Sequence, residues 1–294
     1  MNRKEIITGH IVIFLAVLFF GFNITALKVL MPQWMSATDA TFFRLAGGTA
    51  LFWFASLFIK NDKIESKDWK KLIFSGMLGL FSYLWLFDLG IEYTSAVDVS
   101  IIMSMPPVLV VVLSHFFYKS HISTEKAVGL ALSLGGALML ILIGHESGAA
   151  RTMKGNLYSI GAAVCYASYL ISIKQPSEKY QPITLLRWIF LFATLISLPF
   201  TLKQVVAAPI FAHFELKPTL LLLFVVLFPT FLSYLFMPMA IKRIGQDLVS
   251  IYLYLIPVIT TTTAIVLKMD KLHWDQPVAV FIIFLGVYVS SRKK

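Results

Sequence analysis

Long apolar runs separated by short polar breaks recur along the whole sequence. Each run has about the 20 residues that a helix needs to cross a hydrocarbon layer about 30 Å thick. The runs lack the alternation of polar and apolar residues that marks the strands of a membrane barrel, and in lipid a spanning segment must satisfy its own backbone, so we predict helices. With 58% hydrophobic and 14% charged residues, the composition excludes a water-soluble globule. We predict an all-α integral membrane protein.

The polar breaks divide the 294 residues into ten predicted transmembrane helices with very short loops, which leaves no room for a separate soluble domain. The predicted spans run approximately over His10–Leu30, Ala37–Ile59, Leu72–Ile91, Val97–Tyr118, Ala127–Gly144, Gly155–Ile173, Ile183–Leu202, Pro218–Ile241, Leu248–Leu267 and Pro277–Ser291. Because ten is an even number of crossings, both termini are expected on the same side of the membrane.

An N-terminus in the cytoplasm places 16 of the 25 Lys and Arg residues on the cytoplasmic side and six on the opposite side. Three more, Lys28, Arg44 and Arg187, fall inside apolar runs. Basic residues favour cytoplasmic loops, so we predict that both termini are cytoplasmic. This bias accounts for the net charge of +10 better than nucleic-acid binding does, because the basic residues form no stripe interleaved with aromatic residues. Short loops and the lack of an organelle presequence lead us to expect the inner (plasma) membrane of a prokaryote.

The two halves of the sequence, residues 1–150 and 151–294, resemble each other. A shift of 150 residues aligns Gly90–Val108 with Ala240–Val258 without a gap and places Gly136 on Gly286. Each half holds five predicted spans, and an odd number makes the second half enter the membrane from the opposite side. We therefore predict two inverted five-helix repeats around a central cavity, from which many secondary transporters build a solute site near the membrane midplane. A duplication retained only for folding is the alternative.

Several short motifs lie inside the predicted spans or at their ends. They are Phe43–Leu45 in the second span, Gly90–Ala96 before the fourth, Pro107–Leu109 within it, Gly129–Gly136 in the fifth, Pro257–Ile259 in the ninth and Asp270–Leu272 after it. On these motifs nearly the whole chain resembles the drug/metabolite transporter superfamily, specifically its ten-helix EamA type. It departs from that pattern at Ser120–Ile122, where the family has an acidic residue.

This resemblance implies two bundles of four helices, from spans one to four and six to nine, around a central cavity, with spans five and ten packed outside. It also implies transport of small organic solutes, often export of amino acids or related metabolites. We therefore expect a secondary transporter that works by alternating access, with export as the expected direction. A facilitative channel, and a membrane enzyme or scaffold without transport, are the alternatives.

Two predicted spans combine hydroxyl-bearing residues with a proline in midspan. Ser100, Ser104 and Pro107 share one face of the fourth span. The corresponding face of the ninth span carries Ser250, Tyr254, Pro257 and Thr261. A proline inside a helix removes a backbone hydrogen bond and kinks the helix, and the freed carbonyl is tolerated at that depth when it is buried in protein or faces a cavity. We predict that Pro107 and Pro257 are hinges in two cavity walls, with static kinks as the alternative.

Tyrosine usually gathers at the membrane surfaces, but six tyrosines fall near the middle of predicted spans. Their rings could hold the apolar part of a solute while their hydroxyls orient its polar part. Packed contacts between helices are the alternative for each of them. The predicted substrate-binding residues are Asn23, Tyr83, Ser100, Ser104, Tyr166, Tyr169, Tyr234, Tyr252 and Tyr254.

Charged residues within or beside the spans are candidates for coupling or gating, because an intramembrane charge is costly. Arg44 and Arg187 occupy matching places in the second and seventh spans. They could contact a solute or a gate, or they could snorkel to the nearest interface as anchors. Asp88, Asp98 and Asp247 could bind a proton or a cation. Asp98 and Asp247 also lie where helices begin, where an acid stabilises the helix dipole.

The sequence lacks the motifs of several other functions. It has no G-x-x-x-x-G-K-[ST] phosphate loop, no H-E-x-x-H pair and no G-x-S-x-G elbow. Cys165 is the single cysteine, which excludes an intramolecular disulfide and a multi-cysteine metal site. We therefore expect no catalytic activity, no cofactor and no metal. The expected partners are a small-molecule solute and the lipid bilayer, without nucleic acid, and a monomer is compatible with the sequence.

Overall fold

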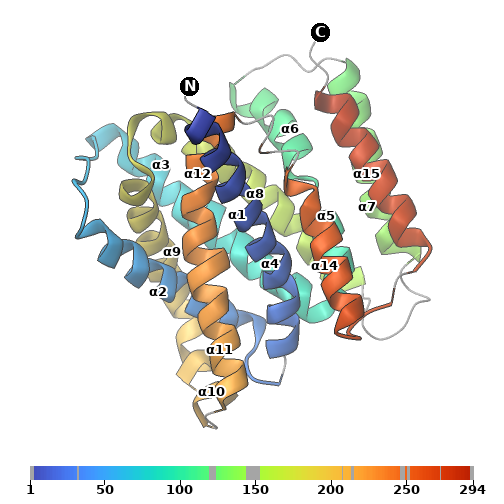
Figure 1. Ribbon diagram of the computed structural model, residues 1–294, viewed down its shortest axis with the longest axis horizontal. Helices are drawn as coiled ribbons and strands as arrows, with labels where there is room; N and C mark the ends of the chain where they lie inside the picture. The colour runs from blue at the N-terminus through green and yellow to red at the C-terminus, as the bar shows by residue number, and fades with distance from the viewer. Residues whose placement is uncertain are drawn as a thin grey trace.

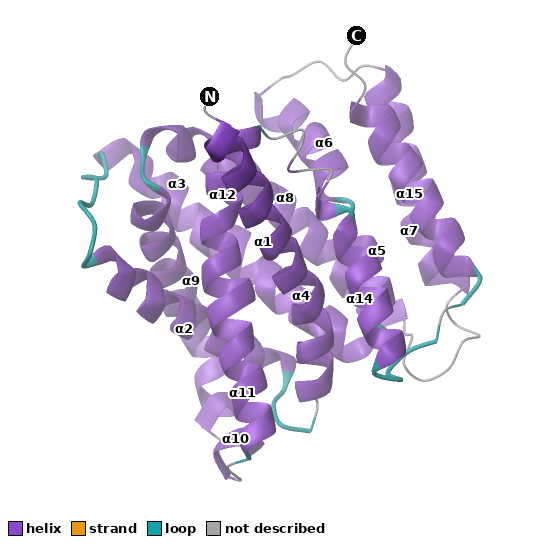
Figure 2. Cartoon of the chain, in the orientation of Figure 1, coloured by secondary structure: helices purple, strands orange, loops and turns teal. Residues whose placement is uncertain are grey.

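The computed structural model describes residues 3–31, 33–118, 124–143, 153–206, 208–212, 215–245, 249, 252–271 and 273–291, which form helices joined by loops and turns, without a strand (Figure 2). The helices of the first half are α1 (Arg3–Leu30), α2 (Ala37–Ser56), η1 (Ser66–Asp68), α3 (Trp69–Phe74), η2 (Ser75–Phe81), α4 (Ser82–Tyr93), α5 (Ala96–Ile102), α6 (Pro106–Tyr118) and α7 (Thr124–Ile143). Those of the second half are α8 (Met153–Lys179), α9 (Pro182–Val206), α10 (Pro209–Ala212), α11 (Leu216–Val225), η4 (Val226–Leu232), α12 (Ser233–Ile244), α14 (Leu255–Val266) and α15 (Asp275–Ser291).

Each predicted span overlaps one or more of these helices. Within the described ranges, six helical stretches are long and apolar enough to cross a membrane. They are Arg3–Leu30, Ser66–Tyr93, Ala96–Ser114, Met153–Lys179, Pro182–Val206 and Leu216–Ile244. Shorter apolar helices cover Ala127–Gly136, Leu255–Val266 and Asp275–Gly286. The all-helical membrane class is therefore confirmed, whereas ten crossings and their inverted arrangement stay predictions.

Two of the long helices contain a π-helical turn that the sequence did not suggest, η2 in the third predicted span and η4 in the eighth. In η2, a Cβ atom at Gly76 would lie 2.7 Å from the carbonyl oxygen of Ile189, so the glycine lets two backbones come together. In η4, Pro229 brings no N–H donor, and the Thr230 hydroxyl donates to the carbonyl oxygen of Val225 at 2.8 Å. Such turns often mark functional positions in helices, and both border the site described below.

Helices from the two halves of the sequence pack against one another in pairs. α4 packs against α8, α2 against α9, α1 against α12 and α7 against α15. Figure 1 shows α1 in blue beside α12 in orange, with α15 in red and α7 in green at one edge of the molecule. α1 begins and α15 ends at the same end of the molecule (Figure 1). Every pair joins one helix of residues 1–150 to one of residues 151–294, so the core belongs to both halves.

At one end of the bundle, the segment before α3 is tied to the turn between α8 and α9. The Asp68 carboxylate accepts hydrogen bonds from the Tyr180 hydroxyl at 2.8 Å and from Lys179 Nζ at 3.0 Å. Lys179 also pairs with Glu65. This contact, together with the ion pair to Lys67, holds the pKa of the exposed Glu65 carboxyl below its usual range. These polar contacts join the two halves outside the apolar core.

At the opposite end, side chains satisfy backbone groups that the helices leave open. Ser36 and Asp39 form a capping box at the start of α2. Lys28 Nζ donates to the carbonyl oxygens of Ile91 and Thr94, each at 2.6 Å. Because these carbonyls end α4, Lys28 ties α1 to α4 and stabilises the negative end of the α4 dipole.

Gly286 lies where α15 crosses α7, and it generates a stability prediction. A Cβ atom there would lie 2.5 Å from the carbonyl oxygen of Gly129 and 2.7 Å from the backbone nitrogen of Ser133. We expect Gly286→Ala to lower the free energy of unfolding by about 1–3 kcal/mol through overpacking, measured as a lower thermal midpoint in detergent. Gly135→Ala is the control, because nothing lies within 4 Å of that position and alanine favours helix. An equal loss for both variants would contradict the close crossing.

Candidate functional site

Four of the predicted tyrosines converge in the middle of the helix bundle. The ring centroids of Tyr83 and Tyr166 are 4.7 Å apart, those of Tyr166 and Tyr169 are 6.0 Å apart, and those of Tyr169 and Tyr234 are 6.5 Å apart. Tyr83 comes from α4, Tyr166 and Tyr169 from α8, and Tyr234 from α12, so three helices distant in sequence supply one cluster. Aromatic pairs at these separations stabilise one another and place several hydroxyls in one apolar region.

A cavity of about 120 Å³ opens from this tyrosine cluster toward the end of α8. It is lined by Phe20, Tyr166, Tyr169, Leu170, Ile173, Ser177, Tyr180, Pro182, Leu185, Leu186, Ile189, Tyr234, Met237, Pro238 and Ile241. These side chains come from α1, α8, α9 and α12 and from the turn after α8. Small-molecule sites usually enclose about 300–1,000 Å³. In this conformation the cavity is therefore smaller than a usual small-molecule site.

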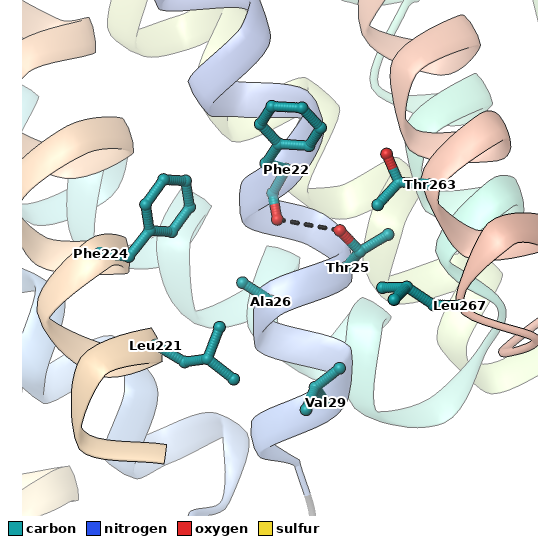
Figure 3. A pocket seen from close by; sticks show the side chains of 8 residues that line it. All are labelled: Phe22, Thr25, Ala26, Val29, Leu221, Phe224, Thr263 and Leu267. Atoms are coloured by element: carbon teal, nitrogen blue, oxygen red, sulfur yellow. Dashed lines mark hydrogen bonds between the residues drawn. The ribbon is translucent and has the colours of Figure 1, made fainter. Parts of the chain in front are cut away.

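A larger groove of about 260 Å³ lies between α1, α11 and α14 (Figure 3). Its lining residues are Phe22, Thr25, Ala26, Val29, Leu221, Phe224, Thr263 and Leu267. Figure 3 shows the Thr25 hydroxyl donating to the carbonyl oxygen of Phe22, at 3.0 Å, and the Thr263 hydroxyl donates to Ile259 at 2.7 Å. Because both hydroxyls are used within their own helices, this apolar groove offers little to orient a polar solute. The tyrosine-lined cavity is the better candidate site.

Arg44 and Asp88 form a buried ion pair behind the tyrosine cluster. Arg44 Nη1 lies 2.6 Å from Asp88 Oδ1, and the two side chains are 1% and 0% exposed. Asp88 Oδ2 also accepts a hydrogen bond from the Thr41 hydroxyl at 2.8 Å. The guanidinium lies over the ring of Phe87 at 5.4 Å, and its Nε contacts the Thr230 hydroxyl at 3.4 Å. Arg44 therefore does not snorkel to an interface but joins α2 and α4 to η4 inside the bundle.

Arg187 occupies the matching place of the second half but has different surroundings. Its guanidinium lies 5.1 Å from the ring of Trp53 and 5.4 Å from that of Trp188. The side chain is partly exposed, and its Nε has no hydrogen-bond partner. Stacking on aromatic rings near the edge of the bundle suits the anchor alternative for this residue. The two matched arginines therefore have different environments.

Some predicted binding residues lie in the bundle interior. They differ in whether their polar groups already have a hydrogen-bond partner. Asn23 on α1 is 1% exposed, and its Oδ1 has no hydrogen-bond partner. The hydroxyl of Tyr234 neighbours that of Tyr83 but has no partner at hydrogen-bonding geometry. By contrast, the buried Ser100 and Ser104 hydroxyls donate to carbonyl oxygens of their own helix. Asn23 and Tyr234 thus keep buried polar atoms that are available to a ligand.

The ninth-span tyrosines point away from the cluster. The Tyr252 hydroxyl lies 3.0 Å from Nδ1 of His10. The Tyr254 ring packs against Phe284 of α15, with centroids 4.6 Å apart. Neither tyrosine lines the cavity. The third predicted residue of this region, Asp247, lies outside the described residues.

Asp98 lies at the start of α5, where the sequence allowed either a cap or a coupling group. Its backbone N–H donates to the side chain of Ser95, the N-cap residue, at 3.0 Å. Its carboxylate accepts a hydrogen bond from Gln276 of α15 at 3.1 Å. An acid in the first turn stabilises the helix dipole. Asp98 therefore links the start of α5 to α15, and its side chain is not part of the tyrosine cluster.

Both predicted hinge prolines lie directly after an interruption of their helix. Residues 103–105 separate α5 from α6, and Pro107 is in the first turn of α6. In the ninth span the helix is interrupted at Tyr254, and Pro257 is in the first turn of α14. Proline is compatible with a first turn, because the N–H groups there have no partner within the helix. Both helices are therefore interrupted just before these prolines, while kinks and bending there stay predictions.

Several residues of the site were not singled out in the sequence. Thr41 and Thr230 contact the ion pair, and Phe52 packs on Phe190 and Phe231 at centroid distances of 5.0 and 4.8 Å. Thr41 carried a weak signal, since it stands three residues before Arg44, as Thr184 does before Arg187. Thr230 carried none, because threonine is common in spans and its role depends on the π-turn.

The comparisons with known proteins agree with one another. Residues 7–142 and 153–292 each match the EamA-like transporter family. An "Uncharacterized transporter" of Archaeoglobus fulgidus is 26% identical over 97% of this chain and 99% of its own length. The "Uncharacterized transporter YetK" of Bacillus subtilis is 23% identical over 76% of this chain and 70% of its own length. A solved structure titled "Crystal structure of protein" covers 99% of this chain and 98% of its own, with a TM-score of 0.64 and 17% identity, which shows the fold alone.

The unequal surroundings of the two arginines predict unequal effects of substitution. Removing one partner of a buried ion pair leaves the other charge uncompensated, which costs about 3–5 kcal/mol. We expect Arg44→Gln to lower the free energy of unfolding by this amount. Arg187→Gln, which loses contacts with two rings at a partly exposed site, should cost about 1 kcal/mol or less. Thermal unfolding in detergent measures both, and losses of similar size would contradict the distinct environments.

Proposed function

Because the chain belongs to the EamA-like transporter family, we propose that it is a secondary carrier of small organic metabolites, such as amino acids or related compounds, with export as the net direction. The observation that carries this proposal is the tyrosine-lined cavity. It lies where α1 of the first half meets α8, α9 and α12 of the second. A mostly apolar cavity with a few convergent polar groups is the usual form of a small-molecule site. The carrier works in a multi-pass membrane setting, with the inner membrane as the proposed location.

We propose that residues 1–150 and 151–294 are two inverted copies of one five-helix unit. The separate family matches of the two halves support this, as do the π-turns that begin at Ser75 and Val226. Further support comes from reciprocal contacts between α7 and α15. A Cβ atom at Gly136 would meet Ile283, and one at Gly286 would meet Ser133. The 150-residue shift exchanges these two contacts, as expected for a two-fold relation.

The same reciprocity occurs where α1 crosses the end of α12 and where α8 meets the end of α4. A Cβ atom at Gly9 would lie 2.5 Å from Ile244 of α12, and one at Gly155 would lie 2.7 Å from the side chain of Thr94, directly after α4. Gly9 corresponds to Gly155, and Thr94 corresponds to Ile244. Two copies related in this way can exchange their conformations, which opens the shared site to one side and then to the other.

The described lining of the cavity runs from one end of the bundle to its middle, and we propose that the cavity opens at that end. At that end its lining includes Tyr180 and Ile241, and in the middle of the bundle the lining includes Phe20, Tyr166 and Tyr234. We assign the open end to the cytoplasm, because the predicted topology places the α8–α9 turn there. A carrier in an inward-open state fits this shape better than a channel, which needs a continuous pore. Bending at the interruptions before Pro107 and Pro257 would then close this end and open the other.

The inverted arrangement can be tested with a matched pair of labelling sites. Lys67 and Lys217 correspond under the 150-residue shift, and both are exposed. In a Cys165→Ser background, we expect Lys67→Cys to react with a membrane-impermeant maleimide from the cytoplasmic side only and Lys217→Cys from the opposite side only. Intact cells and inverted vesicles provide the two sides. Reaction of both cysteines from one side would contradict the inverted repeat.

Transport itself can be tested by counterflow in proteoliposomes preloaded with amino acids, vitamins, sugars or cationic drugs. For a solute that shows counterflow, we expect Tyr169→Ala and Tyr234→Ala to lower uptake at subsaturating solute by about tenfold, equivalent to about 1.4 kcal/mol of lost binding. Tyr254→Ala is the control, because that ring packs on α15 away from the cavity. Flux that no internal solute accelerates would favour a channel. The absence of flux for the whole panel would contradict transport.

A further inference from the structure

The ion pair of Arg44 and Asp88 is isolated inside the bundle. Among the described residues, it is the ion pair in which both side chains are almost fully buried. Arginine keeps its positive charge in proteins, whereas a carboxylate can take up a proton. Asp88 is therefore the partner whose charge can change. If it is neutralised, the buried guanidinium needs another anion, because an unpaired buried charge is strongly unfavourable.

The pair lies one layer of side chains behind the cavity. Arg44 Nε contacts the Thr230 hydroxyl at 3.4 Å, and Tyr234, one helical turn after Thr230, lines the cavity. Tyr234 is 7% exposed, and its hydroxyl has no partner at hydrogen-bonding geometry. The ring packs against Tyr169 and Phe190, with centroids 6.5 and 5.4 Å apart, and its hydroxyl neighbours that of Tyr83. An anionic group in the cavity would reach the guanidinium only after a rotation of this ring, which the binding proposed below requires.

The other ionisable side chains of the surrounding helices have their own environments. They include Asp39 of α2, Lys28 of α1, Tyr83 and Glu92 of α4, Tyr166 and Tyr169 of α8, Arg187 of α9 and Tyr234 of α12. The Asp39 carboxylate accepts hydrogen bonds from the backbone N–H and the hydroxyl of Ser36, each at 2.8 Å. Lys28 is held by backbone carbonyls, and Glu92 accepts the N–H of Ala37 at 2.7 Å. The tyrosines are neutral near pH 7. Asp88 is thus the carboxylate in direct contact with Arg44.

The second half does not repeat this pair. The 150-residue shift places Asp88 on Pro238, and Arg187 lies between two tryptophan rings instead of beside an acid. Within the described part of the chain there is therefore one such buried ion pair, which would bind one proton and one anionic group.

Building on the proposed transport function, we propose that Asp88 and a carboxylate of the solute compete for Arg44, so that an aromatic or apolar monocarboxylate binds together with one proton. The solute carboxylate forms the ion pair with Arg44, the Arg44–Asp88 ion pair breaks, and Asp88 takes up one proton from the bulk solvent. The charge of the site is the same before and after, because one anion and one proton enter together. The tyrosine rings hold the apolar part of the solute.

The experiment compares phenylacetate with its neutral isostere phenylacetamide, using equilibrium dialysis on the detergent-purified full chain. Phenylacetate stays ionised above about pH 6, as carboxylates do, so a pH effect reports on the protein. Because one proton is taken up, we expect the phenylacetate Kd to fall by about tenfold per pH unit between about pH 8 and pH 6, until free Asp88 is itself protonated. Phenylacetamide should bind weakly and without this dependence.

Asp88→Asn retains the size of the side chain but removes the competing charge. We expect its phenylacetate Kd to vary by less than about twofold over the same pH range and to be at least about tenfold lower than that of the wild type near pH 8. Asp39→Asn is the matched control, because Asp39 is also a buried acid of this region but caps α2. This control should keep the pH dependence of the wild type.

Proton uptake by the wild type gives a second measurement in case Asp88→Asn does not fold. In weakly buffered solution with a pH dye, we expect about one proton taken up per phenylacetate bound and none with phenylacetamide. Binding without proton uptake, equal pH dependence of the two probes, or no binding of phenylacetate would each overturn the inference. Counterflow of other solutes would leave the carrier proposal intact in that case, whereas a complete lack of flux would overturn the carrier itself.

Discussion

The helices of this protein approach one another closely because glycine stands at their crossings. At Gly9, Gly155 and Gly286 a single Cβ atom would collide with the facing helix or the residue directly after it. Lipid supplies no hydrophobic drive between helices, so membrane helices associate through tight packing and polar contacts, for which small residues are needed. The arrangement of the tyrosines, the cavity and the ion pair depends on these crossings.

Tight packing decides which polar groups remain available for function. Ser100 and Ser104 donate to their own helix, and Asp98 is engaged with Gln276. Polar groups in a bundle without bulk water must find such partners, because leaving them unpaired costs free energy. Asn23 and Tyr234 keep unpaired polar atoms in the interior. A solute that forms hydrogen bonds with these unpaired polar atoms would gain free energy on binding.

The two halves are alike in helix order but unlike in charge. Arg44 has a carboxylate partner deep in the bundle, whereas Arg187 stacks on tryptophans. A carrier with two equivalent copies has no built-in preference between its two orientations, so an ion pair present in one copy distinguishes them. A proton or an ionic ligand that binds one conformation more tightly than the other shifts the conformational equilibrium toward the first. Under the proposed carrier mechanism, this difference between the halves would make the two orientations unequal in energy.

The sequence by itself determined the helical membrane class and where most helices lie, because the length and apolarity of a run decide whether it can cross lipid. It also singled out Tyr83, Tyr166, Tyr169 and Tyr234 by their unusual depth. Only the tertiary structure decided that these four converge while Tyr254 packs on α15, that Arg44 pairs with Asp88, and that Thr230 reaches the pair through a π-turn. Helix rotation and side-chain direction depend on contacts between segments far apart in the chain, which hydropathy and spacing along one helix do not encode.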